Sequence, residues 1–276
     1  MGDRHPYLEG PYPRAYAHRG WHIDELTGCE NTLAAFVRAA DEGFGYVELD
    51  VHASSDGIPV IHHDAHLDRT TDATGRIADR HAAELDGVTV GGREKLPRLE
   101  AVLTAIPRTR VTIELKSDAV VAPTLAVLER LDAWDRVCLG SFEETRLVRA
   151  RASAGRRLCT SLGQRGVLGL RGRAWLDALP GPLQAAGLLG GAVLPRVHGQ
   201  VAQVPARFGP LTVVDEQFVR TAHAAGKEVH VWTVDEPGPM HTLLDLGVDG
   251  ILSDRPDVLR DVLAVRSEAL RPPEAG

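Results

Sequence analysis

Short apolar runs alternate with stretches of helical periodicity along nearly the whole chain. This alternation is typical of βα units, in which the strands form a parallel sheet and the helices cover it. Strands are predicted at 15–18, 46–51, 111–115, 136–139, 157–160, 191–194, 228–233 and 250–252. Helices are predicted at 32–42, 99–105, 119–133, 143–153, 167–179, 216–225, 238–246 and 256–265.

Eight such units predict an α/β fold of the (β/α)8 TIM barrel type, with a single domain over residues 1–276. The active site of such a barrel lies at the C-terminal ends of its strands. The alternative is an open doubly wound sheet, which usually carries a glycine-rich phosphate-binding loop after its first strand. No such loop follows residues 15–18, so the barrel is favoured.

Two segments lie outside the repeating pattern. The connection 66–97 is polar, is broken by several glycines and is longer than a barrel loop needs. We expect it to form a surface excursion after the second strand, near the mouth of the active site and too short for a domain of its own. The C-terminal residues 267–276, which include two consecutive prolines, are expected to form a flexible tail.

Composition and charge narrow the functional classes. The chain has 276 residues, of which 43% are hydrophobic and 25% charged, as in ordinary globular proteins. A net charge of -7 and the lack of a long basic run disfavour nucleic-acid binding. Three scattered cysteines fit neither a disulfide framework nor a CxxC metal site, and no apolar run is long enough to span a bilayer. We therefore expect a cytoplasmic protein without stable membrane insertion, and the sequence leaves its oligomeric state open.

Two of the predicted strands carry acidic side chains on a single face. In an extended chain neighbouring side chains point to opposite sides, so Glu48 and Asp50 share one face of the second strand. The third strand repeats the pattern with Glu114 and Lys116. If both strands belong to one parallel sheet, the three acids converge at its rim and offer the oxygen ligands that hard divalent cations prefer. The alternative is an ordinary salt bridge, such as one between Glu114 and Lys116.

A series of short motifs follows in a specific order from the first strand to the last helix. They are His18-Arg19-Gly20, Glu30-Asn31-Thr32, Glu48-Leu49-Asp50-Val51, Asp56-Gly57, His63-Asp64, Leu67, Arg69-Thr70-Thr71, Glu114-Leu115-Lys116, Ser141-Phe142, Val231-Trp232-Thr233-Val234, Gly247-Val248-Asp249-Gly250 and Asp254-Arg255-Pro256. In this order the chain resembles the glycerophosphodiester phosphodiesterase family. The resemblance implies a (β/α)8 barrel that uses a divalent cation, Mg²⁺ or Ca²⁺, to split small-molecule glycerophosphodiesters into glycerol 3-phosphate and an alcohol.

The resemblance also implies roles for individual residues. The implied metal ligands are Glu48, Asp50 and Glu114, the implied acid/base pair is His18 and His63, the implied phosphate-binding groups are Arg19 and Lys116, and the implied pocket wall is Trp232. Histidine suits proton transfer because its ordinary pKa of about 6.5 lets one ring accept a proton while the other donates. The order in which the two histidines act is left open. We expect the glycerol 2-hydroxyl to attack phosphorus and give a cyclic phosphate that water then opens.

Several alternatives stay open at this point. Arg19 and Lys116 could pair with Glu30 and Glu114, and Trp232 could belong to the core. His52 could support the site by hydrogen bonding or take part in catalysis, and His230 could line the pocket or fill the barrel. The nearest functional rival is cleavage of a lipid-bearing diester, as in phospholipase D-like or C-like enzymes, which would need an apolar surface near the mouth. A non-catalytic phosphate-binding barrel is the rival from another class.

Two adjacent histidines raise a question of register. The short predicted strand 59–63 ends in His62 and His63, whose side chains point to opposite sides. Only one of the two rings can therefore face the acids. The resemblance selects His63, and Asp64 is expected to hold the backbone that presents it.

Overall fold

Eight parallel strands form the centre of the molecule in the computed structural model, which describes residues 4–178 and 198–269. Their order around the sheet is β8-β7-β6-β2-β1-β13-β12-β9, and a parallel bridge between Ser161 and Val201 joins its two ends. The strands are β1 (Arg14–His18), β2 (Tyr46–Ala53), β6 (Arg110–Leu115), β7 (Val137–Gly140), β8 (Cys159–Thr160), β9 (Val201–Pro205), β12 (Glu228–Trp232) and β13 (Gly250–Ser253). The predicted TIM barrel is therefore confirmed.

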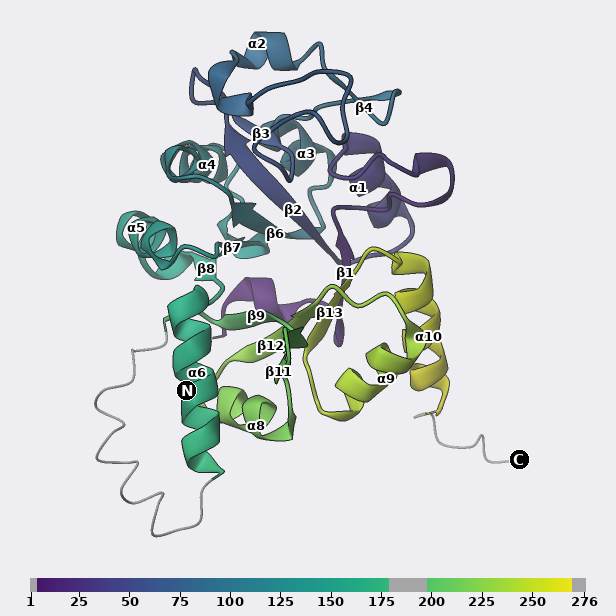
Figure 1. The fold of residues 1–276 in the computed structure, drawn as a ribbon, viewed down its shortest axis with the longest axis vertical. Helices are drawn as coiled ribbons and strands as arrows, with labels where there is room; N and C mark the ends of the chain where they lie inside the picture. Colours follow the sequence, from purple (N-terminus) through teal and green to yellow (C-terminus); the bar gives the residue numbers. More distant parts are fainter. Residues whose placement is uncertain (1–3, 179–197, 270–276) are drawn as a thin grey trace.

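Helices surround the strands on all sides (Figure 1). They are α1 (Leu33–Asp41), α3 (Leu99–Ala105), α4 (Val121–Arg130), α5 (Glu144–Ala154), α6 (Gln164–Asp177), α8 (Glu216–Ala224), α9 (Pro237–Asp245) and α10 (Pro256–Ala269). Side chains that precede them fix two of the starts, because Thr32 accepts a hydrogen bond from Ala35 N and Asp215 accepts one from Phe218 N. None of the helices in the described ranges is long and apolar enough to cross a bilayer.

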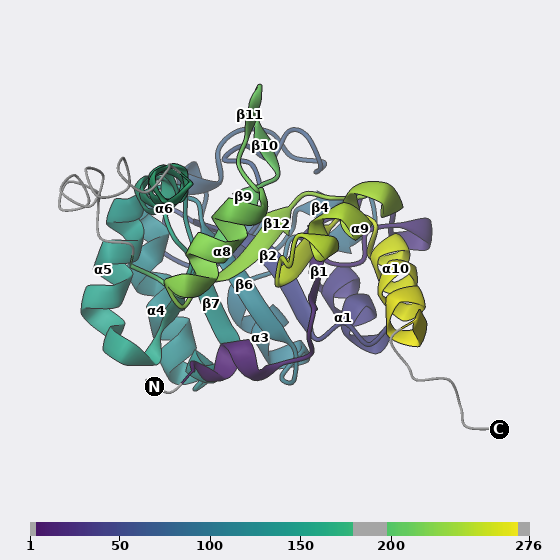
Figure 2. The ribbon, with the colours of Figure 1, turned by 90° about the horizontal axis from the view of Figure 1, so that it is seen from below.

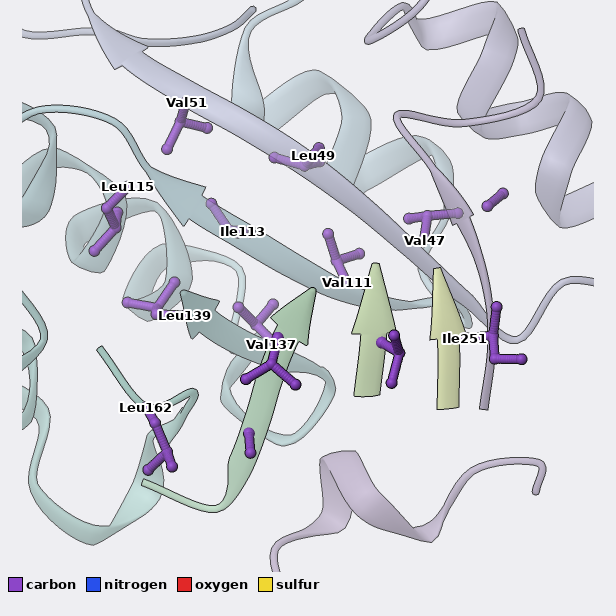
Figure 3. Close-up of a cluster of buried hydrophobic side chains, with 14 of the residues drawn as sticks. Val47, Leu49, Val51, Val111, Ile113, Leu115, Val137, Leu139, Leu162 and Ile251 are labelled. Carbon is purple, nitrogen blue, oxygen red and sulfur yellow. The ribbon is translucent and has the colours of Figure 1, made fainter. Parts of the chain in front are cut away.

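The core lies between the strands and the helices. Figure 3 shows Val47, Leu49 and Val51 along β2 beside the apolar side chains of β6, and all of them are buried. Burying apolar side chains contributes roughly 25 cal/mol per Å² removed from water, so this face holds the strands in place. Side chains alternate along β2, so Val47, Leu49 and Val51 point outward against the helices. Glu48 and Asp50 consequently point toward the barrel interior. The predicted two-faced character of the second strand is confirmed.

The sixth strand of the barrel lies at a different place from the one the pattern indicated. The predicted strand 191–194 lies outside the described residues, as does residue 179 of the predicted helix 167–179. The strand that completes the barrel is β9, whose Val201, Ala202 and Val204 are fully buried. Its run is short and interrupted by Gln203, which donates a hydrogen bond to Thr112 Oγ1 at 3.1 Å, so the hydrophobic pattern did not reveal it.

The excursion 66–97 consists of short elements with an apolar cluster of their own. They are η3 (Ile77–Asp79), α2 (Ala82–Leu85), β4 (Thr89–Val90) and β5 (Glu94–Lys95), packed around Leu67, Ile77, Leu85, Val90 and Leu96. The segment follows β3 (Pro59–Ile61), which pairs antiparallel with β2 and so begins beside the acid-bearing strand. The position of the excursion is thereby fixed at the side of the barrel where Glu48 and Asp50 lie.

Three further features were not part of the predicted barrel. A hairpin formed by β10 (Arg207–Phe208) and β11 (Leu211–Thr212) follows β9 and stands away from the body of the molecule (Figure 2). At the opposite end, η1 (Pro6–Glu9) lies across the barrel (Figure 2). Single 3-10 turns connect other elements at Asp24–Leu26, Asp118–Val120, Trp134–Arg136 and Gly155–Arg157. Helix α10 continues through Ala269, and the rest of the expected tail, 270–276, lies outside the described residues.

Candidate functional site

Three carboxylates converge at the C-terminal ends of two neighbouring strands. Glu48 and Asp50 come from β2 and Glu114 from β6, where Asp50 and Glu114 are directly opposite each other. One oxygen from each of the three carboxylates lies within 4.8 Å of the others. Glu48 is 4% exposed and Asp50 only 1%. The convergence expected from strand alternation is therefore present, and parallel register is its physical cause.

Burial gives these acids unequal protonation behaviour. Burial, together with the Asp50 carboxylate, raises the pKa of Glu48 to about 8. Burial acts in the same direction on Asp50, but Lys116 and Arg19 outweigh it and hold the pKa of that carboxyl below its usual value. Burial also raises the pKa of Glu114. Asn31 adds support by donating a hydrogen bond to Asp50 Oδ2 at 2.9 Å.

Two cations lie against the acids. Lys116 Nζ is 2.9 Å from Asp50 Oδ1 and 3.0 Å from Glu114 Oε2. Arg19 NH1 is 3.0 Å from Glu30 Oε1, while its Nε lies 3.5 Å from Asp50 Oδ2 and is buried without a hydrogen bond. The ion pairs that the sequence left open are thus formed. Arg19 Nε nevertheless remains a donor without a bonded acceptor at the edge of the acid cluster.

The acid cluster is suited to a divalent cation. Glu48 Oε2 is buried and accepts no hydrogen bond, although a buried carboxylate is costly unless a partner compensates it. Lys116 contacts the other two carboxylates, and among the described residues Glu48 has only the His18 ring, 3.6 Å away, as an ionisable partner in ion-pair range. Oxygen ligands of this type match Mg²⁺ and Ca²⁺ better than softer metals. The residues present therefore fit a hard divalent ion.

His18 lies beside this cluster at the end of β1. Its Nδ1 is 2.7 Å from Asp254 Oδ1, and its Nε2 is 3.6 Å from Glu48 Oε2. Burial acts to lower the pKa of His18, but the charges of Glu48 and Asp254 outweigh it and raise that pKa. His22 Nε2 reaches the same Asp254 oxygen at 3.2 Å. The hydrogen bond to Asp254 fixes the ring and leaves Nε2 directed to the acids.

The two adjacent histidines differ in their surroundings. His62 is buried with both ring nitrogens engaged, Nδ1 with the Asp64 carbonyl at 2.8 Å and Nε2 with Thr70 Oγ1 at 2.9 Å. His63 Nδ1 is 2.6 Å from Asp64 Oδ1, and one-third of its side chain is exposed. The charge of His63 also lowers the pKa of Asp50. His62 is therefore a satisfied structural residue, whereas the His63 ring is held at Nδ1 by Asp64 and is partly open to solvent.

A chain of ion pairs joins the excursion to the barrel. Arg69 Nε donates to Asp64 Oδ2 at 2.6 Å, and its NH1 and NH2 donate to Glu30 at 3.0 and 2.8 Å. Asp64 contacts His63 and Glu30 contacts Arg19. Arg69 therefore links His63 and Arg19 through these two carboxylates. Arg69 and Asp254 belong to the sequence motifs, but the sequence alone assigned no role to either. Asp254 directly follows β13 and Arg69 lies in the excursion, and such loop positions often carry functional residues. That position was the signal in the sequence that could have identified them.

The remaining sequence candidates lie in three different environments. Trp232 ends β12 and is partly buried, with its ring 5.8 Å from that of Phe142 in an edge-on arrangement. His52 Nε2 bonds the His63 carbonyl at 3.1 Å, and burial lowers the pKa of His52 to about 4, so it stays neutral. His230 is fully buried between Tyr16 and Glu228. It fills the barrel rather than lining the mouth.

Comparisons with known proteins give one consistent picture of what this chain resembles. The model of the glycerophosphoryl diester phosphodiesterase family matches residues 18–258. A Mycobacterium tuberculosis protein named "Probable glycerophosphodiester phosphodiesterase 2" is 41% identical over 92% of this chain and 92% of its own length. A glycerophosphodiester phosphodiesterase of Caldanaerobacter subterraneus is 30% identical over 88% of this chain and 94% of its own. An Oleispira antarctica phosphodiesterase, solved in complex with the product sn-glycerol-3-phosphate, superimposes with a TM-score of 0.70 at 26% identity, covering 92% of this chain and 97% of that one.

Proposed function

The chain belongs to the glycerophosphoryl diester phosphodiesterase family and is an enzyme of that class, and from this premise we propose that it hydrolyses glycerophosphodiesters with a divalent cation and two histidines. The products are glycerol 3-phosphate and an alcohol, in keeping with the sn-glycerol-3-phosphate bound to the Oleispira relative. The observation that carries the proposal is the convergence of three carboxylates beside His18, with Glu48 Oε2 lacking any hydrogen bond.

Glu48, Asp50 and Glu114 would hold the cation, Mg²⁺ or Ca²⁺. When bound there it supplies positive charge to the non-bridging phosphate oxygens, which reduces the repulsion that makes a phosphodiester resistant to attack. Lys116 then has two functions, because its ammonium balances Asp50 and Glu114 and also presents a charge to phosphate. The Arg19 guanidinium offers a planar set of donors, of which the buried Nε is free of hydrogen bonds.

The two histidines supply the proton transfers. The glycerol 2-hydroxyl attacks phosphorus, one ring accepts its proton, and the other ring donates a proton to the leaving alcohol. The new bond joins the 2-oxygen to phosphorus and the broken bond joins phosphorus to the alcohol oxygen. Water then opens the cyclic phosphate with the two rings in reversed roles. His18 is held by Asp254 and His63 by Asp64, so each ring keeps one nitrogen for this work.

An assay with purified enzyme tests the proposal. We expect release of glycerol 3-phosphate from a panel of glycerophosphodiesters, loss of activity after exhaustive chelation, and recovery with Mg²⁺ or Ca²⁺. Glu114→Gln removes one ligand charge with little change in shape, so activity should collapse while the fold survives. Glu129→Gln, which changes an exposed glutamate of helix α4, is the matched control. Full turnover by Glu114→Gln, or by the chelated enzyme, would exclude the metal assignment.

A further inference from the structure

Helices α5 and α6 form a basic region on an acidic protein. Residues 143–177, which hold both helices, contain eight arginines, no lysine and three acids, a net charge of +5, whereas the whole chain carries -7. The two helices contact each other on one side of the barrel, and α10 lies on the other side (Figure 1). A positive region of this kind attracts anionic partners, which include nucleic acids and membrane surfaces.

The arginines of this region are only partly neutralised by acids. Asp118 faces two of them, Arg146 Nε at 2.9 Å and Arg149 NH1 at 2.8 Å, so one of the two positive charges is left uncompensated. The Arg149 side chain is 59% exposed. Arg165 is exposed as well and has no acid within ion-pair distance among the described residues. Free positive charge is therefore available on both helices.

Exposed apolar side chains lie among these arginines. Leu168 is 67% exposed and Trp175 is 51% exposed, and their spacing of seven residues places both on the same face of α6. Arg165 precedes Leu168 by three residues and so flanks it on the helix surface. On α5, Val148 is 52% exposed. Exposed Trp and Leu side chains beside arginines are typical of surfaces that lie in the interface of a membrane.

The Trp175 ring is held in one orientation. The Arg171 guanidinium lies 5.0 Å from the centre of this ring. Arg171 is itself buried, and its NH1 is 2.9 Å from Asp215 Oδ2. An indole ring is amphipathic and suits the level of the lipid head groups. Because the ring is already ordered, it loses less conformational entropy when it enters that layer.

A groove joins the surfaces of the two helices. It has a volume of about 420 Å³, and its lining includes Phe142, Val148, Arg149 and Arg165. Phe142 lies two residues after Gly140, which is the register partner of Glu114, so the groove begins near the mouth of the barrel. The basic and apolar side chains of α5 and α6 therefore form one continuous surface that extends to the mouth.

We propose that the α5–α6 face, which we define as Val148, Arg149, Arg165, Leu168 and Trp175, binds the surface of a bilayer that contains anionic lipids. The two arginines contact lipid phosphates, while Leu168 and Trp175 enter the boundary between head groups and acyl chains. A nucleic-acid backbone would engage the arginines but gives the exposed aliphatic side chains no partner, so the bilayer is favoured. The inference goes beyond the proposed function, because it does not depend on the reaction.

Vesicle sedimentation of the purified protein tests the proposal. Vesicles of phosphatidylcholine alone are compared with vesicles that contain an equal share of anionic phosphatidylglycerol. We expect the wild-type protein to bind the anionic vesicles and to leave the phosphatidylcholine vesicles in the supernatant. Binding should weaken as salt rises from about 0.1 M to about 1 M, because the screening length falls from about 10 Å to about 3 Å.

Variants then separate the two contributions of the face. The double variant Arg149→Gln, Arg165→Gln should lose about 25-fold in vesicle affinity, since each arginine near an anionic surface contributes about fivefold. Leu168→Ser, Trp175→Ser should lose at least about tenfold, because these side chains no longer leave water. The matched controls lie on α10, where Arg260→Gln and Val265→Ser change side chains that are 46% and 60% exposed. Both controls should bind like the wild type, and all variants should unfold at the wild-type temperature.

Three results would overturn the inference. The first is a wild-type protein that binds neither kind of vesicle, or both kinds equally. The second is an equal loss of binding in the α10 controls, which would show that the contact is not confined to the α5–α6 face. The third is binding of a DNA duplex, without vesicle binding, that persists in Leu168→Ser, Trp175→Ser. Since no step of this test measures hydrolysis, its outcome is independent of the outcome for the proposed function.

Discussion

Replacing Glu48 by glutamine should stabilise the metal-free protein at alkaline pH while abolishing its response to metal. Burial and the neighbouring Asp50 carboxylate raise the pKa of Glu48 from its ordinary 4.5 to about 8. The folded state therefore retains a proton that the unfolded state releases between these two values. The free energy of unfolding consequently falls as pH rises from about 4.5 to about 8.

The size of the effect follows from the difference of about 3.5 pH units. At about 1.36 kcal/mol per unit, ionised Glu48 costs the folded state up to about 5 kcal/mol. This is an upper bound, because Asp50, Glu114 and His18 titrate together with Glu48. Glu48→Gln has no such charge, so the free energy of unfolding of the variant should exceed that of the wild type at pH 8.5 by a few kcal/mol. The difference should shrink toward zero as pH approaches 4.5.

Urea denaturation in chelator at several pH values measures this difference, and thermal unfolding with added Mg²⁺ or Ca²⁺ measures the response to metal. A cation displaces the proton from Glu48, so its stabilising effect on the wild type should be larger at pH 8.5 than at pH 6. The variant should show little stabilisation at either pH, and Glu129→Gln should behave like the wild type. A Glu48→Gln protein that is less stable than the wild type in chelator at pH 8.5, or that is stabilised equally by metal, would refute the reasoning.

The other predictions concern catalysis. His63→Ala should lower kcat at least about 100-fold with metal binding retained. His62→Ala should lower kcat far less, because His62 uses both ring nitrogens in structural hydrogen bonds. A larger loss of kcat in His62→Ala, measured by steady-state kinetics, would reverse the assignment. A diester whose glycerol lacks the 2-hydroxyl should be a very poor substrate, since an internal nucleophile has an effective concentration of about 10^5 M or more, and equal rates would exclude the cyclic route. Arg69→Ala should reduce kcat/KM by about 10- to 100-fold, because it releases Asp64 and Glu30 together. Arg69→Lys should restore part of that loss. Unchanged kinetics in Arg69→Ala would show that the chain of ion pairs does not position the site.

The sequence by itself determined the barrel and the acid cluster. Alternation in 46–51 and 111–115 buries one face of each strand, and the opposite face necessarily carries Glu48, Asp50 and Glu114. Parallel pairing then brings the ends of the two strands together, so the convergence of the acids follows from local pattern and one topological rule.

Only the tertiary structure decided which partners hold the remaining groups. Asp254 lies 236 residues from His18 in the sequence and Arg69 lies 39 residues from Glu30, and no periodicity relates positions so distant. The strand β9 was also missed, because it is short and its Gln203 is stabilised by Thr112, a contact from across the barrel. Local patterns fix which face of an element is apolar, whereas the pairing of polar side chains depends on where the loops bring them, and that depends on the packing of the whole barrel.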